Sequence, residues 1–282
     1  MNAEKVSLRQ LIIQLFIQKR TYVYYALIIQ LFAIIFFLIV GQFDNFSFMI
    51  DNHWIVTDKG PFSNIIFQLF FMTSAIIDMF FCGVLCWQNQ RINLSQTWHL
   101  VPVSSSKLYL GNLISSLLEC AYIFIVQMAS IFLIGWIAVK TMTDTNTDTN
   151  EISIVKGYFS FNFSTIIQSL LMLVLLVLGI FLFVDFCNFF GSVIAETLPV
   201  KNTKILRWII MLVLAIIGIY LVYQANINFE KYYYKLVIAK PNIGPNFITY
   251  TIGESNLEMF IEAIILAIFD WIMINKYFEP KN

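Results

Sequence analysis

The chain has 282 residues, of which 59% are hydrophobic and only 12% are charged, and its mean hydropathy is +0.78. Such a small share of charged residues cannot cover the surface of a soluble globular protein. The composition therefore indicates a protein that is surrounded by lipid. The 17 basic and 17 acidic residues cancel, so the net charge gives no indication of a nucleic-acid partner.

The first segment, residues 1–20, is predicted to form an amphipathic helix. Between Glu4 and Arg20 apolar residues recur every three or four positions, and glutamines occupy the opposite side. Such a helix should lie in the plane of the membrane interface. The pair Lys19 and Arg20 favours a break before the first span, although a helix that continues into that span remains the alternative.

Six apolar runs are long enough to cross a bilayer, because about 20 residues at about 1.5 Å each span a hydrocarbon core of roughly 30 Å. The predicted transmembrane spans are 22–40, 65–87, 108–139, 163–187, 208–225 and 257–277. They predict one polytopic membrane domain over residues 1–282. The fold class is an all-α integral membrane protein.

Basic residues orient this set of spans. Eleven of the 17 fall on one side of the membrane and six on the other. The side with the excess is expected to be cytoplasmic, so both termini are predicted to be cytoplasmic. The expected location is a cell membrane, as in a multi-pass protein of the bacterial plasma membrane.

The two longer outer connections differ in character. Residues 140–162 contain the polar tract TDTNTDTN, which is typical of a solvated loop. Residues 226–256 hold a run of tyrosines and then Pro241 and Pro245. This pattern fits either a partly embedded, broken helix or an ordinary aromatic anchor at the headgroups.

Acidic residues inside the predicted spans are the candidate intramembrane site. Asp78 and Glu119 lie at similar distances from the cytoplasmic ends of adjacent spans, and each shares a helix face with small or polar residues. They are interpreted either as a proton-sensitive or substrate-lining pair, or as a structural hydrogen-bonded pair. Glu262 is a further pore-lining candidate. Asp185 and Asp270 are expected near cytoplasmic helix ends, at the interface.

Sequence signatures of enzyme chemistry are absent. The two histidines, His53 and His99, fall in different loops and cannot build an intramembrane zinc site of the HExxH type. The chain has neither a GxSxG motif nor a GxxxxGK[ST] phosphate loop. We therefore expect no catalysis and no cofactor in this chain, and any energy from ATP must come from a partner.

The cytoplasmic connection 88–107, QNQRINLSQTWHLVPVSSSK, carries the most informative pattern. The short amphipathic segment Ile92 to Leu100 precedes Pro102, and serines 104–106 are placed to cap the third span. The pattern predicts a small rigid projection on the cytoplasmic face, with Trp98 as its largest apolar side chain.

This stretch resembles permease subunits of type-2 ATP-binding-cassette (ABC) exporters. The resemblance in motif covers residues 95–116, SQTWHLVPVSSSKLYLGNLISS, where an LxPxS-like run precedes a helix that begins K-x-Y. The order of an interfacial helix, two spans, the projection and four more spans is also similar. The sequence departs from the family at 88–91, where Gln, Asn, Gln and Arg stand in place of an acidic residue.

The resemblance implies that the projection is a coupling helix seated in a separate ATPase subunit. It implies two such ATPases, which bind the ATP and magnesium, together with a second permease that is identical or different. The connection 226–256 would line the exit. The residues implied in ATPase contact are Arg91, Ile92, Leu94, Ser95, Trp98, His99 and Leu100.

The leading hypothesis is therefore a permease for export of a peptide, a lipid-linked molecule or another amphiphile. Two alternatives remain. A proton-coupled secondary carrier would use Asp78 and Glu119 as its relay, although the chain lacks the internal repeat common in such carriers. A non-transporting membrane scaffold or immunity protein would need no ATPase partner.

Overall fold

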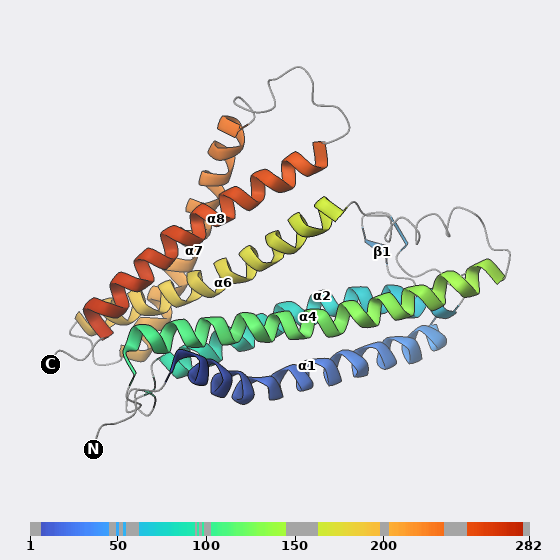
Figure 1. The fold of residues 1–282 in the computed structure, drawn as a ribbon, viewed down its shortest axis with the longest axis horizontal. Coiled ribbons are helices and arrows are strands. Elements are labelled where there is room, and N and C mark those ends of the chain that lie inside the picture. Colours follow the sequence, from blue (N-terminus) through green and yellow to red (C-terminus); the bar gives the residue numbers. More distant parts are fainter. Residues whose placement is uncertain are drawn as a thin grey trace. The chain divides into compact units, whose positions relative to one another are not determined.

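The computed structural model describes residues 7–44, 49–50, 53–54, 62–93, 95, 98, 103–144, 163–197, 203–233 and 247–278. Long helices dominate these residues (Figure 1). The elements are α1 (Leu8–Asp44), β1 (Met49–Ile50), β2 (His53–Trp54), α2 (Phe62–Asn93), α4 (Ser105–Asp144), α6 (Phe163–Thr197), α7 (Thr203–Tyr233), α8 (Phe247–Met273) and the π-helical turn η2 (Ile274–Phe278).

Five of the described helices, α1, α2, α4, α6 and α7, are long and apolar enough to cross a membrane. A helix satisfies its own backbone hydrogen bonds, which is the requirement for a segment in hydrocarbon. The predicted multi-pass helical membrane architecture is confirmed at this level. The sixth predicted span, 257–277, falls on α8 and η2, where Glu258, Glu262 and Asp270 reduce the apolar character.

The described residues are almost entirely helical, as the all-α prediction expects, with one pair of two-residue strands beside the helices. Strands β1 and β2 pair antiparallel, with Met49 opposite Trp54 and Ile50 opposite His53. These four residues fall in the predicted connection between the first two spans. They do not alter the helical character of the spans.

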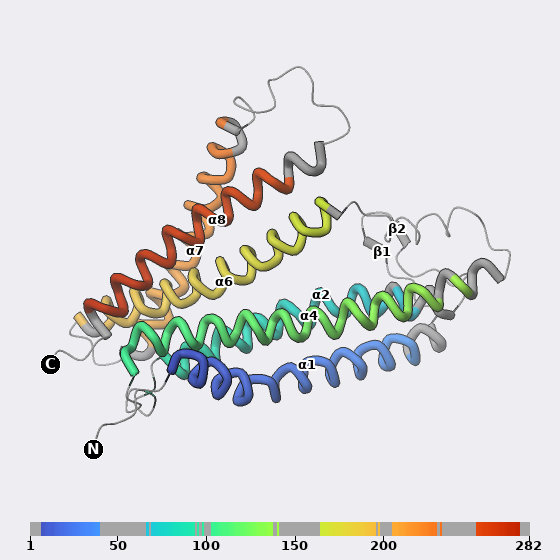
Figure 2. The backbone as a smooth tube through the Cα atoms, viewed as in Figure 1, coloured from blue at the N-terminus to red at the C-terminus, as the bar shows by residue number. Residues whose placement is uncertain are grey.

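Helix α1 begins with a capping box. The Ser7 backbone N–H donates to Gln10 Oε1 at 3.1 Å, while the Gln10 N–H donates to Ser7 Oγ at 3.3 Å. The predicted break at Lys19 and Arg20 was wrong, since α1 runs unbroken through this pair (Figure 2). Nothing in the stretch breaks a helix, and Lys19 is fully buried instead of lying at a water-exposed turn.

The connection between α2 and α4 is shorter than predicted because α2 continues past Trp87 to Asn93. Beyond it, the Ser95 N–H donates to the Ile92 carbonyl at 3.1 Å. Helix α4 begins at the predicted serines, where the Ser104 carbonyl accepts from the Leu108 N–H at 3.0 Å. Leu94, His99, Leu100 and Pro102 lie outside the described residues.

The outer connections are also partly helical. Helix α4 reaches Asp144 and α7 reaches Tyr233, while α8 begins at Phe247. Tyr232, near the end of α7, is 69% exposed, as a headgroup aromatic would be. The two prolines, Pro241 and Pro245, and residues 145–150 of the TDTNTDTN tract lie outside the described residues.

The chain divides into two compact units. The first unit comprises Met1–Ile12, Cys86–Leu117 and Asn162–Asn282, and the second comprises Ile13–Leu85 and Leu118–Phe161. Within the first unit, α6 packs against both α8 and α7 (Figure 1). Its apolar core includes Phe181, Leu182, Phe189 and Met273.

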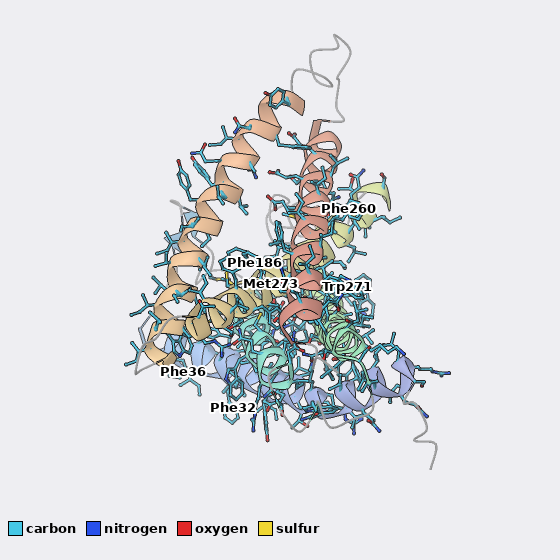
Figure 3. The ribbon with its side chains drawn as sticks, turned by 90° about the vertical axis from the view of Figure 1, so that its left-hand side faces the viewer. Phe32, Phe36, Phe186, Phe260, Trp271 and Met273 are labelled. Carbon is cyan, nitrogen blue, oxygen red and sulfur yellow. The ribbon has the colours of Figure 1, made fainter. Side chains whose placement is uncertain are left out.

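The second unit has its own core between α1, α2 and α4. Leu15, Val23 and Ile123 are buried there, and the Phe16 and Tyr122 rings meet edge to face at 6.4 Å. Large apolar side chains also cover the outside of both units, as Phe32 and Phe260 illustrate (Figure 3). Phe32 is 67% exposed, and such side chains are suited to lipid.

Candidate functional site

Polar side chains gather in the first unit where α2 ends and α4 begins. Asn112 on α4 donates to Asn93 Oδ1 at 2.8 Å and to the Asn89 carbonyl at 3.0 Å. Ser116 donates to Asn89 Oδ1 at 2.6 Å. All four residues are buried. We call Asn89, Asn93, Asn112 and Ser116 the helix-end network; it ties the two ends of the connecting segment 94–104 to each other.

The first turns of α4 are tied to the end of α8 as well. Ser106 donates to Asn275 Oδ1 at 2.7 Å, and the Tyr109 hydroxyl donates to Asp270 Oδ2 at 2.7 Å. Asn275 lies on the π-helical turn η2, which widens the end of α8. The Tyr109 ring also packs edge-on against Phe189 of α6, with centroids 5.9 Å apart. Three helices thus meet at Tyr109.

Asp185 and Asp270 are buried inside the first unit, while their expected level near the membrane interface stays a prediction. Asp270 is fully buried and Asp185 is only 3% exposed. Both carboxyl groups act electrostatically on Tyr109. A sequence signal for burial existed on α6, where Asp185, Asn188 and Ser192 recur at helical spacing and are all buried on one face.

The residues implied in ATPase contact have different surroundings in the first unit. Arg91 is exposed and its guanidinium lies 5.8 Å from the centroid of the Trp87 ring. Ile92 is buried, so its side chain packs within the chain. Ser95 and Trp98 are partly exposed. Trp98 is thus the large aromatic of this segment that retains free surface.

The second unit contains a separate polar group. Gln127 on α4 donates through Nε2 to Gln30 Oε1 on α1 at 3.1 Å, and both residues are 2% exposed. The Gln127 side chain also acts on the carboxyl group of Asp78 on α2. Sequence analysis missed both glutamines, although a lone glutamine inside an apolar run is itself a signal of polar helix contact.

Glu119 has other charged groups around it than Asp78, although neither of its carboxylate oxygens has a hydrogen-bond partner among the described residues. It is fully buried in the second unit, and the charges of Lys19 and Arg20 act on it. Lys19 is fully buried too. The Cys120 thiol lies within electrostatic range of both Asp78 and Glu119. The two acids therefore belong to one polar region, in which Gln127 acts on Asp78 while Lys19 and Arg20 act on Glu119.

Glu262 on α8 is partly buried, and its Oε1 is a buried oxygen without a hydrogen-bond partner among the described residues. Its position on the face of α8 toward protein is compatible with the pore-lining prediction, which stays a prediction. No group of three or more histidine, cysteine, aspartate or glutamate side chains in the described part of the chain could hold a metal ion.

Comparison with protein-family models, with curated proteins and with solved structures gave no match. The class of the protein is thus defined by the helices themselves. Five long apolar helices, with apolar side chains facing outward and polar side chains facing inward, make this chain a multi-pass helical membrane protein.

Proposed function

We propose that this chain is the membrane-spanning permease subunit of an ATP-driven exporter of the type-2 ABC class. Its substrate would be a peptide, a lipid-linked molecule or another amphiphile. A separate ATPase subunit, present twice, would bind ATP and magnesium, and a second permease copy or homologue would complete the pathway in the lipid bilayer. The resemblance of residues 95–116 to the family's coupling segment is the starting point of this proposal.

The helix-end network is the observation that supports the proposal best. Asn112 and Ser116 hold α4 to Asn89 and Asn93 at the end of α2. Because both ends of segment 94–104 are fixed to the same pair of helices, a push on this segment moves α2 and α4 together. An ATP-driven permease needs such a rigid connection between its partner and its spans.

Two side-chain hydrogen bonds, one from Tyr109 and one from Ser106, link the start of α4 to α8 as well. Tyr109 to Asp270 and Ser106 to Asn275 join the start of α4 to the end of the last helix. The last helix follows directly on the connection proposed to line the exit. Movement at segment 94–104 would therefore reach the exit side through α8.

A proton-coupled carrier is the second candidate, because Asp78 and Glu119 lie in one buried polar region of the second unit. The different groups that act on them count against a direct relay, since Gln127 acts on Asp78, and Lys19 and Arg20 act on Glu119. A scaffold or immunity protein would show no ATP hydrolysis in a complex and no transport.

Trp98→Ala tests the proposal. The tagged chain is purified from its native membrane, and Mg-ATP hydrolysis of the co-purified complex is measured. If Trp98 is the anchor in an ATPase groove, its loss should cost about 2 kcal/mol or more, or roughly 30-fold in affinity. The complex should then lose the ATPase subunit while the chain still inserts.

Trp208→Ala is the matched control, since Trp208 is a 72% exposed tryptophan at the start of α7. It should leave assembly intact. If Trp98→Ala keeps both the subunit and substrate-stimulated hydrolysis, or if the wild-type preparation hydrolyses no ATP, the permease proposal fails.

A further inference from the structure

Two hydrogen bonds within the first unit join the first turns of α4 to the end of α8 and to the turn η2 that follows it. Tyr109 donates to Asp270 Oδ2 at 2.7 Å, and Ser106 donates to Asn275 Oδ1 at 2.7 Å. Ser106 and Tyr109 are three residues apart, so their side chains lie on one face of α4. Their two partners, by contrast, are five residues apart along the chain.

The π-helical turn η2 allows the second of these bonds to form. On an α-helix, five residues correspond to a rotation of about 140°, which would carry Asn275 away from the face that holds Asp270. From Ile274 onward the helix is π-helical, with hydrogen bonds between residues five apart, so each turn holds more residues and Asn275 lies closer to that face. The Ser106–Asn275 bond therefore depends on the π geometry, whereas Asp270 lies on the regular helix before it.

The surroundings of the two bonds also differ. Asp270 is fully buried, Tyr109 is 5% exposed, and the Tyr109 ring packs against Phe189 of α6. Asn275, on the other hand, is exposed. A segment with few buried contacts and an exposed hydrogen bond opens locally at a lower free energy than a buried one. The Ser106–Asn275 bond is therefore the one that can open while the Tyr109–Asp270 bond stays closed.

We propose that η2 is a conformational latch. In the closed state the π turn presents Asn275 to Ser106. In the open state the turn relaxes towards α-helical geometry, which rotates Asn275 away and exposes the Ser106 hydroxyl, while the Tyr109–Asp270 bond remains as the pivot. The role of the latch rests on the proposed function, because opening would release the start of α4, which follows segment 94–104, from the last helix. Single π turns within helices are frequent at functional sites.

Cysteine accessibility tests the latch without ATP. Ser106→Cys is made in a background that lacks the four native cysteines, and the purified chain is labelled in detergent with a hydrophilic maleimide. The thiol is a weak hydrogen-bond donor, so it keeps a contact with Asn275. Because Ser106 is only 8% exposed in the closed state, labelling requires opening. The reaction should be about tenfold or more faster than that of Leu108→Cys, which is 2% exposed and lies on the neighbouring turn.

Ser105→Cys is the matched control for fraying of α4, since Ser105 is also 8% exposed and precedes Ser106 in the first turn. Only the labelling rate at position 106 should respond to Asn275. Asn275→Leu keeps the bulk of the side chain and removes the acceptor, so it should raise the rate of Ser106→Cys by about threefold or more and leave Ser105→Cys unchanged. Asn275→Asp keeps an acceptor oxygen and should preserve the original rate.

Two results would overturn the latch. If Ser106→Cys reacts as slowly as Leu108→Cys, the turn does not open. If Asn275→Leu changes the rates at positions 105 and 106 equally, or changes neither, Asn275 does not hold Ser106 in particular. Because Asn275 is exposed, its substitution should not impair folding of the chain.

A disulfide tests the role of the latch. In Ser106→Cys/Asn275→Cys, oxidation holds the latch closed, and Mg-ATP hydrolysis of the co-purified complex should fall about tenfold or more and recover after reduction, because a blocked conformational step limits turnover. Lys107→Cys/Asn275→Cys, shifted by one residue on α4, is the control for oxidation itself. Unchanged hydrolysis in the cross-linked protein would contradict the role of the latch. A wild-type complex without hydrolysis would refute the permease proposal alone, and the labelling rates would then decide on the latch.

Discussion

At the scale of single residues, the side chains expected to contribute most to stability are those that hydrogen-bond buried polar atoms. Tyr109 and Asp270 form a buried hydrogen bond of 2.7 Å between α4 and α8. The second carboxylate oxygen of Asp270, Oδ1, has no hydrogen-bond partner among the described residues. Asp270 therefore depends strongly on the Tyr109 hydroxyl.

Tyr109→Phe removes that hydroxyl and keeps the ring against Phe189. Because it leaves a fully buried carboxyl group unpaired, we expect a loss of about 1 to 3 kcal/mol in the free energy of unfolding. Thermal unfolding in detergent measures the loss. In the double variant Tyr109→Phe/Asp270→Leu the loss should be smaller than the sum of the single ones, and strict additivity would contradict the coupling.

Lys19 provides a second prediction for single residues. Lys19→Ala removes the buried one of the two positive charges that act on Glu119, and the loss of such a charge inside the protein typically costs about 3 kcal/mol or more. Arg20→Ala is the matched control, because Arg20 is exposed and should change stability little. Levels of folded protein in the membrane report the difference. Adding Glu119→Gln to Lys19→Ala should restore part of the loss; if it does not, the charge of Glu119 is balanced elsewhere.

At the scale of helices, close packing in the first unit is controlled by small residues. Gly218 of α7 faces the ring of Phe183 on α6, and a Cβ at Gly218 would come within 2.6 Å of Phe183 Cζ. A rigid ring has little room to move away. The glycine therefore allows α7 to approach α6 closely, as small residues do at helix contacts in membranes.

Gly218→Ala should separate α6 from α7 and lower the thermal unfolding temperature, with a cost of about 1 to 3 kcal/mol from overpacking. Gly179→Ala on α6 is the control, since a Cβ there meets no atom within 4 Å. It should be neutral or stabilise by up to about 1 kcal/mol through helix propensity. Equal effects of the two substitutions would show that α7 does not pack on α6 through Gly218.

At the scale of the whole molecule, charge distribution predicts which ends of the helices face the cytoplasm. With 11 basic residues on one side and six on the other, segment 94–104 should be cytoplasmic and the connection after α4 should be outside. Ser95→Cys, in a background without native cysteines, should react with a membrane-impermeant maleimide only after permeabilisation, and Thr145→Cys should react in intact cells. Labelling of Ser95→Cys in intact cells would invert the topology and remove segment 94–104 from any cytoplasmic partner.

The sequence alone indicated that lipid surrounds this protein, which segments form its helical spans, and that serines cap the start of α4. These features follow from short stretches of sequence: the hydropathy of a window of residues, the length of a helix compared with the thickness of the bilayer, and serines that precede an apolar run. The same local patterns placed Asn112, Ser116 and Glu119 on a polar face, and all three are buried. The two-stranded hairpin was missed because four residues carry too little pattern.

Only the tertiary structure decided which polar groups meet. Asp78 and Glu119 looked like a pair because they share a depth, yet different groups act on them: Gln127 acts on Asp78, and Lys19 and Arg20 act on Glu119. Asp270 was placed only by its position near the end of a run, and the structure adds that it is buried and hydrogen-bonded to Tyr109, 161 residues away along the chain. The local sequence indicates how far a residue lies along its span and on which face of the helix it lies. Its partner on another helix depends on how distant segments pack against each other, so that partner can be named only once the helices are assembled.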